Sequence, residues 1–267
     1  MIGHFRVLVL DDATGYGFAF DELLRLGRSS LPGPAQVRAA SSVREVVELI
    51  DAGERFDVAI IDLGLGARQP SGLGAIHVLG QRTDTRIAVH TDYHEQTRRL
   101  LFLYAAFTWY DPVALLPKTG DAPGRDRAAV ATDLAAKIAM INRGQSPHPD
   151  LAIPFRARLG KERAFERILK THEDLDKWIA FVEYSNITDV ARALHLGRKT
   201  VENWVRSKYD ATQALLNDAE AAKIDVTDAR VNVSSLGRAN QSVIHQFARS
   251  QSWFFTDPVV RDRFQRS

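Results

Sequence analysis

Five short apolar runs in the first half of the chain constrain its fold more than any other feature. Residues 7–10, 58–61, 87–89 and 113–116 are the clearest runs, and residues 35–40 form a weaker one. Runs that are apolar throughout, rather than alternating, are typical of strands that are buried on both faces in a parallel sheet.

Helical patterns separate these runs. Val43, Val46, Val47 and Ile50 follow the spacing of one helix face, with Ser41 or Ser42 as the expected cap. Strand and helix therefore alternate five times, which predicts an α/β fold with a doubly wound, five-stranded parallel sheet and helices on both faces. The predicted helices are residues 16–26, 43–50, 73–79, 96–107 and 128–141.

Polar residues follow four of the apolar runs, at the point where each predicted strand ends. The carboxyl ends of parallel strands meet at one edge of the sheet, and ligands bind there. We therefore expect three carboxylates, one hydroxyl and one ammonium at a single edge: Asp11, Asp12, Asp62, Thr91 and Lys118.

The residue types at this edge suit phosphoryl transfer. Clustered carboxylates repel one another unless a cation neutralises them, and we predict that Asp11, Asp12 and Asp62 bind Mg²⁺. Asp62 is also the predicted nucleophile, because aspartate can form an acyl phosphate. Lys118 would offset the charge of the phosphoryl group, and Thr91 would donate its hydroxyl to a phosphoryl oxygen. No organic cofactor is predicted.

Residues 5–143 resemble the receiver domain of two-component response regulators. The resemblance implies a flavodoxin-like fold, Asp62 as phosphoacceptor, Thr91 as switch hydroxyl, and a histidine kinase or another phosphodonor as partner. Asp92 stands where the family usually has a small residue and Leu115 where it often has an aromatic one, so an atypical, phosphorylation-independent switch is an alternative. The matching segments are VLVLDDA (7–13), FDVAIIDLGL (56–65), IAVHTDY (87–93) and LLPKTG (115–120).

The second half of the chain contains a predicted helix-turn-helix. Residues 144–155 are rich in proline and indicate a linker, and helices are expected at 162–171 and 174–184. In residues 187–209, Thr188 can cap a short helix, and Leu196 and Gly197 make the turn to a second one. The apolar residues expected between the two helices are Val190, Ala191, Leu194, Leu196, Val201 and Trp204.

The stretch ALHLGRKTVENWV resembles the LuxR-type helix-turn-helix, which implies an all-α domain that binds double-stranded DNA as a homodimer. The predicted domains are the receiver at 1–143, the linker at 144–155, the DNA-binding domain at 156–216 and a helical extension at 217–267. Side chains of the second helix would contact phosphates and bases. Those expected to face outward are Arg198, Lys199, Thr200, Asn203, Arg206, Ser207 and Lys208.

Charge is distributed in keeping with this interpretation. Residues 1–150 hold 16 Lys and Arg against 18 Asp and Glu, whereas residues 151–267 hold 19 against 15. The segment 192–208 contains five basic residues and one acid, and a local basic surface attracts a phosphate backbone. Without cysteine, a signal peptide or a long apolar run, the chain is expected to be cytoplasmic and to have no membrane partner.

Three points stay open at this level. The extension contains Trp253, Phe254 and Phe255, which are expected to pack on the DNA-binding domain or to make a dimer contact. An RNA-binding antiterminator or a protein-interaction adaptor is an alternative to a DNA-binding regulator. A phosphatase of the haloacid dehalogenase type is less favoured, because its second aspartate would fall at Ala13, and the prediction is a protein that is not an enzyme.

Overall fold

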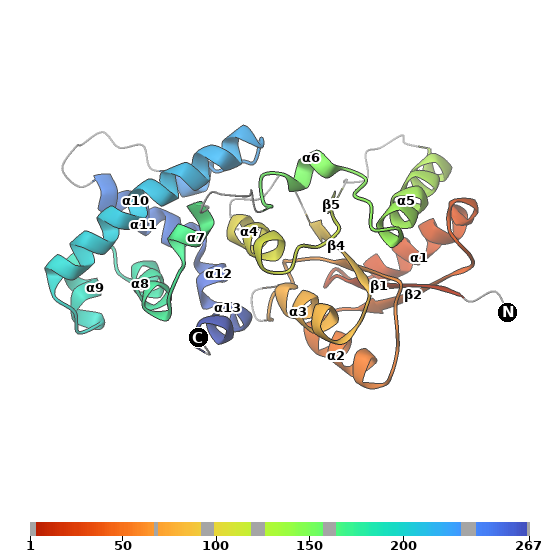
Figure 1. The fold of residues 1–267 in the computed structure, drawn as a ribbon, viewed down its shortest axis with the longest axis horizontal. Coiled ribbons are helices and arrows are strands. Elements are labelled where there is room, and N and C mark those ends of the chain that lie inside the picture. The colour runs from red at the N-terminus through yellow and green to blue at the C-terminus, as the bar shows by residue number, and fades with distance from the viewer. Residues whose placement is uncertain are drawn as a thin grey trace. The chain divides into compact units, whose positions relative to one another are not determined.

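The computed structural model describes residues 4–66, 69–91, 99–118, 126–156, 164–230 and 239–265, and Figure 1 draws their course. These residues form two compact units. The first unit contains those within Met1–Tyr93 and Ala105–Arg156, and the second contains those within His94–Tyr104 and Ala157–Ser267. Each unit has its own buried apolar residues, so each is described by itself.

A five-stranded parallel sheet forms the centre of the first unit. Its strands are ordered β2-β1-β3-β4-β5, and every neighbouring pair is parallel. The strand order reverses between β1 and β3, which confirms the predicted doubly wound sheet. The strands are β1 (Phe5–Leu10), β2 (Ala35–Ala40), β3 (Val58–Ile61), β4 (Arg86–Thr91) and β5 (Ala114–Pro117).

Helices cover both faces of this sheet. Helices α1 (Tyr16–Leu26) and α5 (Arg127–Asn142) pack against each other, and α2 (Val43–Asp51) packs against α3 (Leu73–Arg82) (Figure 1). Ser42 caps α2, as expected, by accepting a hydrogen bond from the backbone of Glu45 at 3.3 Å. Two short elements complete the unit, the 3-10 helix η1 (Arg28–Ser30) and α6 (Pro149–Ala152), which lies in the predicted linker.

The core beneath α1 and α5 shows which strand positions face these helices. Alternate residues of each strand enter this core, because successive side chains of a strand point to opposite faces. Phe20 and Leu24 of α1 and Ile138 of α5 meet them there. The strand residues of this core are Phe5, Val7, Val9, Val58, Ile60, Ala88, Ala114 and Leu116.

Helix α4 (Leu100–Trp109) has the sequence LLFLYAAFTW and no charged residue. Its residues Leu100–Phe107 are all buried, as expected for a helix that is apolar on every side. The helix is divided between the units: residues up to Tyr104 belong to the second unit, and those from Ala105 to the first. Residues 96–98 of the predicted helix lie outside the described residues.

The second unit is helical in its described part. Its last three helices come from the predicted extension, and 3-10 helix η3 (Thr227–Ala229) precedes them. No described helix has both the length and the apolar character of a membrane span. After α4, the α-helices of this unit are α7 (Ala164–Ile168), α8 (His172–Glu183), α9 (Ile187–Ala193), α10 (Arg198–Ala221), α11 (Ala239–Ser250), α12 (Ser252–Thr256) and α13 (Pro258–Gln265).

Aromatic side chains form the centre of this second core. Trp178 of α8 is fully buried, with its ring stacked on Phe255 of α12 at 5.1 Å between centroids. The edge of the Trp204 ring from α10 meets Trp178 at 5.0 Å, and Phe247 of α11 lies 5.6 Å away. Phe255 and Phe254 of the extension are therefore buried against helices of their own unit, which is the first of the two roles expected, whereas Trp253 is half-buried.

Candidate functional site

The acidic cluster arises from the register of the first three paired strands. Leu10 of β1 lies beside Ile61 of β3, so the residues that follow them, Asp11 and Asp62, are brought together. The backbone continues the pairing, because Asp62 N–H donates to the Leu10 carbonyl at 2.9 Å and Asp11 N–H donates to Ala40 at 3.0 Å. The paired ends of β1 and β3 therefore fix the positions of the buried residues Asp11 and Asp62.

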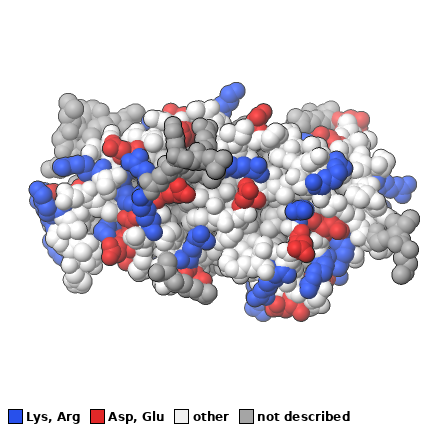
Figure 2. Space-filling view, viewed as in Figure 1, with Lys and Arg blue, Asp and Glu red and all other residues white. Residues whose placement is uncertain are grey.

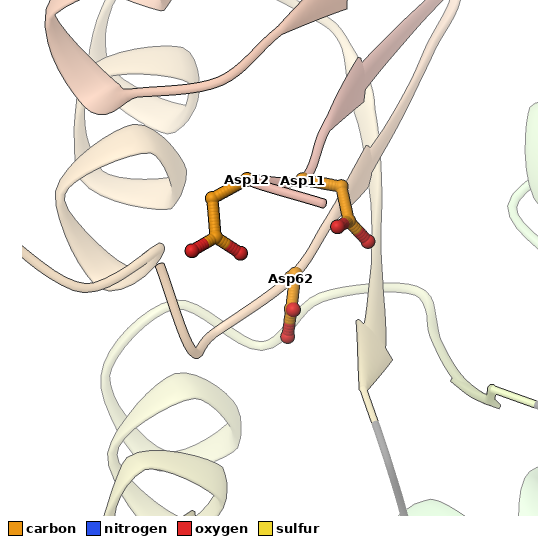
Figure 3. A group of neighbouring side chains, drawn as sticks. All are labelled: Asp11, Asp12 and Asp62. Atoms are coloured by element: carbon orange, nitrogen blue, oxygen red, sulfur yellow. The ribbon is translucent and has the colours of Figure 1, made fainter. Parts of the chain in front are cut away.

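Asp11, Asp12 and Asp62 offer a set of oxygen ligands. Their side chains lie near one another beyond the strand ends (Figure 3), and one oxygen of each lies within 4.8 Å of the others. Asp11 and Asp62 are buried, whereas Asp12 is exposed. Adjacent ligand oxygens in an octahedral Mg²⁺ site lie about 3 Å apart, so these side chains would have to move closer together to bind that ion directly. The donor set fits Mg²⁺, since hard cations prefer carboxylate oxygens.

Lys118, which follows β5, completes the cluster. Its Nζ lies 2.8 Å from Oδ2 of Asp62 and 2.5 Å from Oδ2 of Asp11. Burial lowers the pKa of Lys118, but the charges and hydrogen bonds of Asp62 and Asp11 outweigh it, so the pKa is raised above its ordinary value. A charged ammonium therefore bridges two of the three carboxylates.

Both carboxylate oxygens of Asp62, the predicted nucleophile, accept hydrogen bonds. Oδ1 accepts a hydrogen bond from the backbone of Gly64 at 3.1 Å, while Oδ2 accepts from Lys118. The loop returns close to this residue at Gly72, where a Cβ atom would lie 2.0 Å from the Asp62 carbonyl oxygen. A side chain at position 72 would therefore displace the backbone that carries Asp62.

Thr91 lies at the end of β4 and is fully buried. The backbone N–H of Lys118 donates to its carbonyl at 3.0 Å, so β4 and β5 bring these two residues to the same edge as the aspartates. All five predicted edge residues thus occur where expected, and their roles in chemistry stay predictions. Leu115 is buried within β5, and Asp92 lies outside the described residues.

Sequence reasoning missed two neighbours of Lys118. The Tyr16 ring lies 5.1 Å from Lys118 Nζ, and the Tyr16 hydroxyl lies 3.1 Å from Nδ1 of His90. A usable signal existed, because His90 is a polar residue inside the apolar segment IAVHT of β4. It shares the strand face of Ala88, which enters the core with Phe20 of α1.

The second unit contains the predicted helix-turn-helix. Asn186, not Thr188, caps α9: its side chain accepts from the backbone of Asp189 at 2.9 Å, since the helix begins one residue before Thr188. The turn passes through His195, which has a φ of 54°, and Leu196 N–H donates to Ala191 at 2.8 Å. As expected, the buried residues include Val190, Ala191, Val201 and Trp204, whereas Leu194 and Leu196 are half-buried.

One face of α10 presents polar and basic side chains to solvent. Arg198 forms an exposed pair with Glu202 at 2.8 Å. The space-filling view shows Lys and Arg side chains at the end of this unit where α9 and the start of α10 lie (Figure 2). The exposed residues on the predicted DNA-contacting face are Arg198, Lys199, Thr200, Asn203, Arg206 and Ser207.

Lys208 does not lie on the outward face of α10, where it was expected. Its side chain is buried, and its Nζ donates to Oδ2 of Asp174 and to the Arg167 carbonyl, each at 2.7 Å. Burial lowers the pKa of Lys208 more than Asp174 raises it, and the charges of Lys170 and Lys177 lower it further. The prediction that Lys208 faces outward is wrong, because a carboxylate from α8 draws its ammonium into the helical core.

Comparisons with known proteins give distant similarities in structure. No protein-family model and no curated protein sequence matches this chain. A structure of two RcsB dimers bound to two parallel DNAs has 19% identity and a TM-score of 0.47, and the match covers 82% of this chain and 99% of that one. RcsB from Salmonella enterica serovar Typhimurium, bound to promoter P1flhDC in the presence of phosphomimetic BeF3-, has 18% identity and a TM-score of 0.48. That match covers 81% of this chain and 98% of the other.

Proposed function

We propose that this chain is a DNA-binding response regulator in which Asp62 accepts a phosphoryl group and thereby controls binding through α10. The observation that carries the proposal is the contact of the Lys118 ammonium with Asp62 and Asp11, next to a third carboxylate. A buried nucleophile, a cation and an acidic metal-binding set are the parts that phosphoryl transfer to aspartate requires.

An acyl phosphate can donate the phosphoryl group to Asp62. An Oδ atom of Asp62 attacks phosphorus, a P–O bond forms to Asp62, and the donor's P–O bond breaks with its electron pair leaving on the carboxylate product. Lys118 would offset the negative charge on the phosphoryl oxygens. Mg²⁺ held by Asp11, Asp12 and Asp62 would supply further positive charge at this point.

Phosphorylation is tested on the full chain with Mg²⁺ and acetyl phosphate, by measuring the mass of the intact protein. We expect the wild type to gain the mass of one phosphoryl group and Asp62→Asn to gain none. Asp84→Asn, which changes an exposed aspartate before β4, is the matched control and should react like the wild type. A wild type that gains no mass would contradict the phosphoacceptor and leave a phosphorylation-independent switch.

DNA binding would use the exposed face of α10. Lys199, Asn203 and Arg206 are spaced by four and three residues, so they lie along one side of the helix, where they can reach phosphates and base edges. The proposal includes a homodimer on two half-sites, a histidine kinase or another phosphodonor as partner, and a cytoplasmic location.

The interface is tested by fluorescence anisotropy with random duplex DNA at several salt concentrations. Lys199→Ala and Arg206→Ala should each weaken binding and lower the slope of log affinity against log salt by about 0.9 for each phosphate that the variant no longer neutralises. Arg249→Ala removes an exposed arginine from α11 and is the charge-matched control. Equal affinity of all three variants, or stronger binding to RNA than to DNA, would contradict the proposal.

A further inference from the structure

The ammonium of Lys118 has a third neighbour besides its two aspartates. Tyr16 is the first residue of α1, and its ring centroid lies 5.1 Å from Lys118 Nζ, within the range of a cation–π interaction. The attraction between a cation and an aromatic face does not depend on the charge of Asp62. The ammonium is therefore held by two kinds of contact, and only one of them changes when Asp62 reacts.

His90 fixes the position of the Tyr16 ring. The Tyr16 hydroxyl is within hydrogen-bond distance of His90 Nδ1, and the two rings lie 5.7 Å apart. The edge of Phe20, one turn further along α1, meets His90 at 6.4 Å. Tyr16 is thereby tied to the buried strand β4 as well as to its own helix.

His90 is suited to this place because it is neutral. Burial, followed by the charge of Lys118, lowers its pKa to about 4, against a smaller opposing effect of Asp62. A neutral imidazole has one nitrogen with a lone pair, to which the Tyr16 hydroxyl can donate. It therefore binds Tyr16 without placing a second cation beside Lys118.

We propose that Tyr16 and His90 are positioning residues that hold the Lys118 ammonium at the acidic pocket when Asp62 is phosphorylated. The inference rests on the proposed function. Once an oxygen of Asp62 bonds to phosphorus, the carboxylate loses its charge and its ion pair with Lys118 weakens. The ion pair with Asp11 remains, but a lysine side chain gains rotational freedom when one of its restraints is lost. The Tyr16 ring replaces the lost restraint and keeps the ammonium within reach of the phosphoryl oxygens.

The first measurement is the rate of phosphorylation by acetyl phosphate at saturating Mg²⁺, together with the Kd for Mg²⁺. Tyr16→Leu removes the ring and should slow labelling by about fivefold, as expected when one cation–π interaction is removed. Tyr16→Phe keeps the ring and should recover most of the rate, and His90→Phe should fall between the two. The Kd for Mg²⁺ should change less than twofold in all three, since Lys118 stays bonded to Asp11 and Asp62 while Asp62 is unphosphorylated.

The second measurement follows the Lys118 ε-carbon by NMR in the full chain, with the resonance assigned by its loss in Lys118→Met. The ring current of Tyr16 should still shift this resonance in Asp62→Asn, and the shift should vanish when Tyr16→Leu is added. This readout needs no phosphorylation, so a wild type that takes no phosphoryl group leaves it intact. A Lys118 resonance that moves fully in Asp62→Asn alone, or is unchanged by Tyr16→Leu, overturns the proposal.

Discussion

The two units of this protein each contain a lysine bonded to an aspartate, and the two pairs differ in what surrounds them. In the first unit, Lys118 bridges Asp62 and Asp11 at the open end of a sheet, with 22% of its side chain exposed. In the second, Lys208 bonds to Asp174 inside a helical core, with 7% exposed.

The two sites differ in how many of the hydrogen bonds that their carboxylates can accept are already formed. Asp174 accepts from Lys208, from the indole N–H of Trp204 at 2.7 Å and from the backbone of Lys170 at 3.1 Å, so it has little room for a ligand. The cluster around Lys118 has three carboxylates for one ammonium among the described residues, which leaves negative charge for a metal. The same ion pair therefore supports structure in one unit and suits a ligand in the other.

The largest expected effect is on the pair in the second unit. Asp174→Ala leaves the Lys208 ammonium buried without its carboxylate and should lower the free energy of unfolding by about 3–5 kcal/mol. Urea denaturation measures this loss. Asp176→Ala, on the same helix, is the control, because its exposed pair with His172 should contribute only about 0–1 kcal/mol. Similar losses of unfolding free energy in both variants would show that the buried Lys208–Asp174 pair has no special structural role.

A smaller effect is expected at Lys118, and it concerns ligand affinity. Lys118→Met removes a cation that competes for Asp11 and Asp62, so the affinity for Mg²⁺ should increase roughly tenfold. Isothermal titration calorimetry measures this directly. Lys137→Met removes a lysine that pairs with Asp133 on α5 and should leave the affinity as in the wild type. Weaker Mg²⁺ binding in Lys118→Met would mean that the lysine organises the carboxylates and does not compete for them.

The smallest expected effect is on pH dependence, where the two lysines should act with opposite sign. The pKa of Lys118 is raised above 10.5, so its contribution to stability is complete below that value and is lost as the pH rises through the folded pKa. The pKa of Lys208 is lowered, so the folded state releases this proton first and stability increases with pH up to 10.5. NMR titration of the two ε-carbons should give midpoints on opposite sides of 10.5, and midpoints on the same side would refute the contrast.

The sequence predicted the sheet and its edge because both depend on local pattern. Continuous apolar runs define buried strands, and the residue after each run, such as Asp62 or Lys118, must then lie at the carboxyl end. The prediction extended to all five edge residues for this reason.

The polar contacts inside the two units could not be predicted in this way. Lys208 has the residue type of an outward position, but it lies seven residues after Val201 and four after Trp204, which is the spacing of the buried face of α10. Only the packing of α8 explains why a lysine fits there, because it places Asp174, 34 positions earlier, against the ammonium. His90 and Tyr16 are 74 positions apart and meet because α1 covers the face of β4 that carries His90. These contacts come from tertiary packing, for which a single sequence offers no periodic signal.

The division of α4 between the two units affects where the chain can be truncated. In the second unit, the backbone of Leu101 donates to the side chain of Gln251 at 3.3 Å, and Phe102 meets Phe254 at 5.2 Å. A fragment that stops at residue 143 would lack Gln251 and Phe254 and expose a row of apolar side chains to water. Such a fragment should self-associate, because a cut at residue 143 separates the first half of α4 from the other helices of its unit.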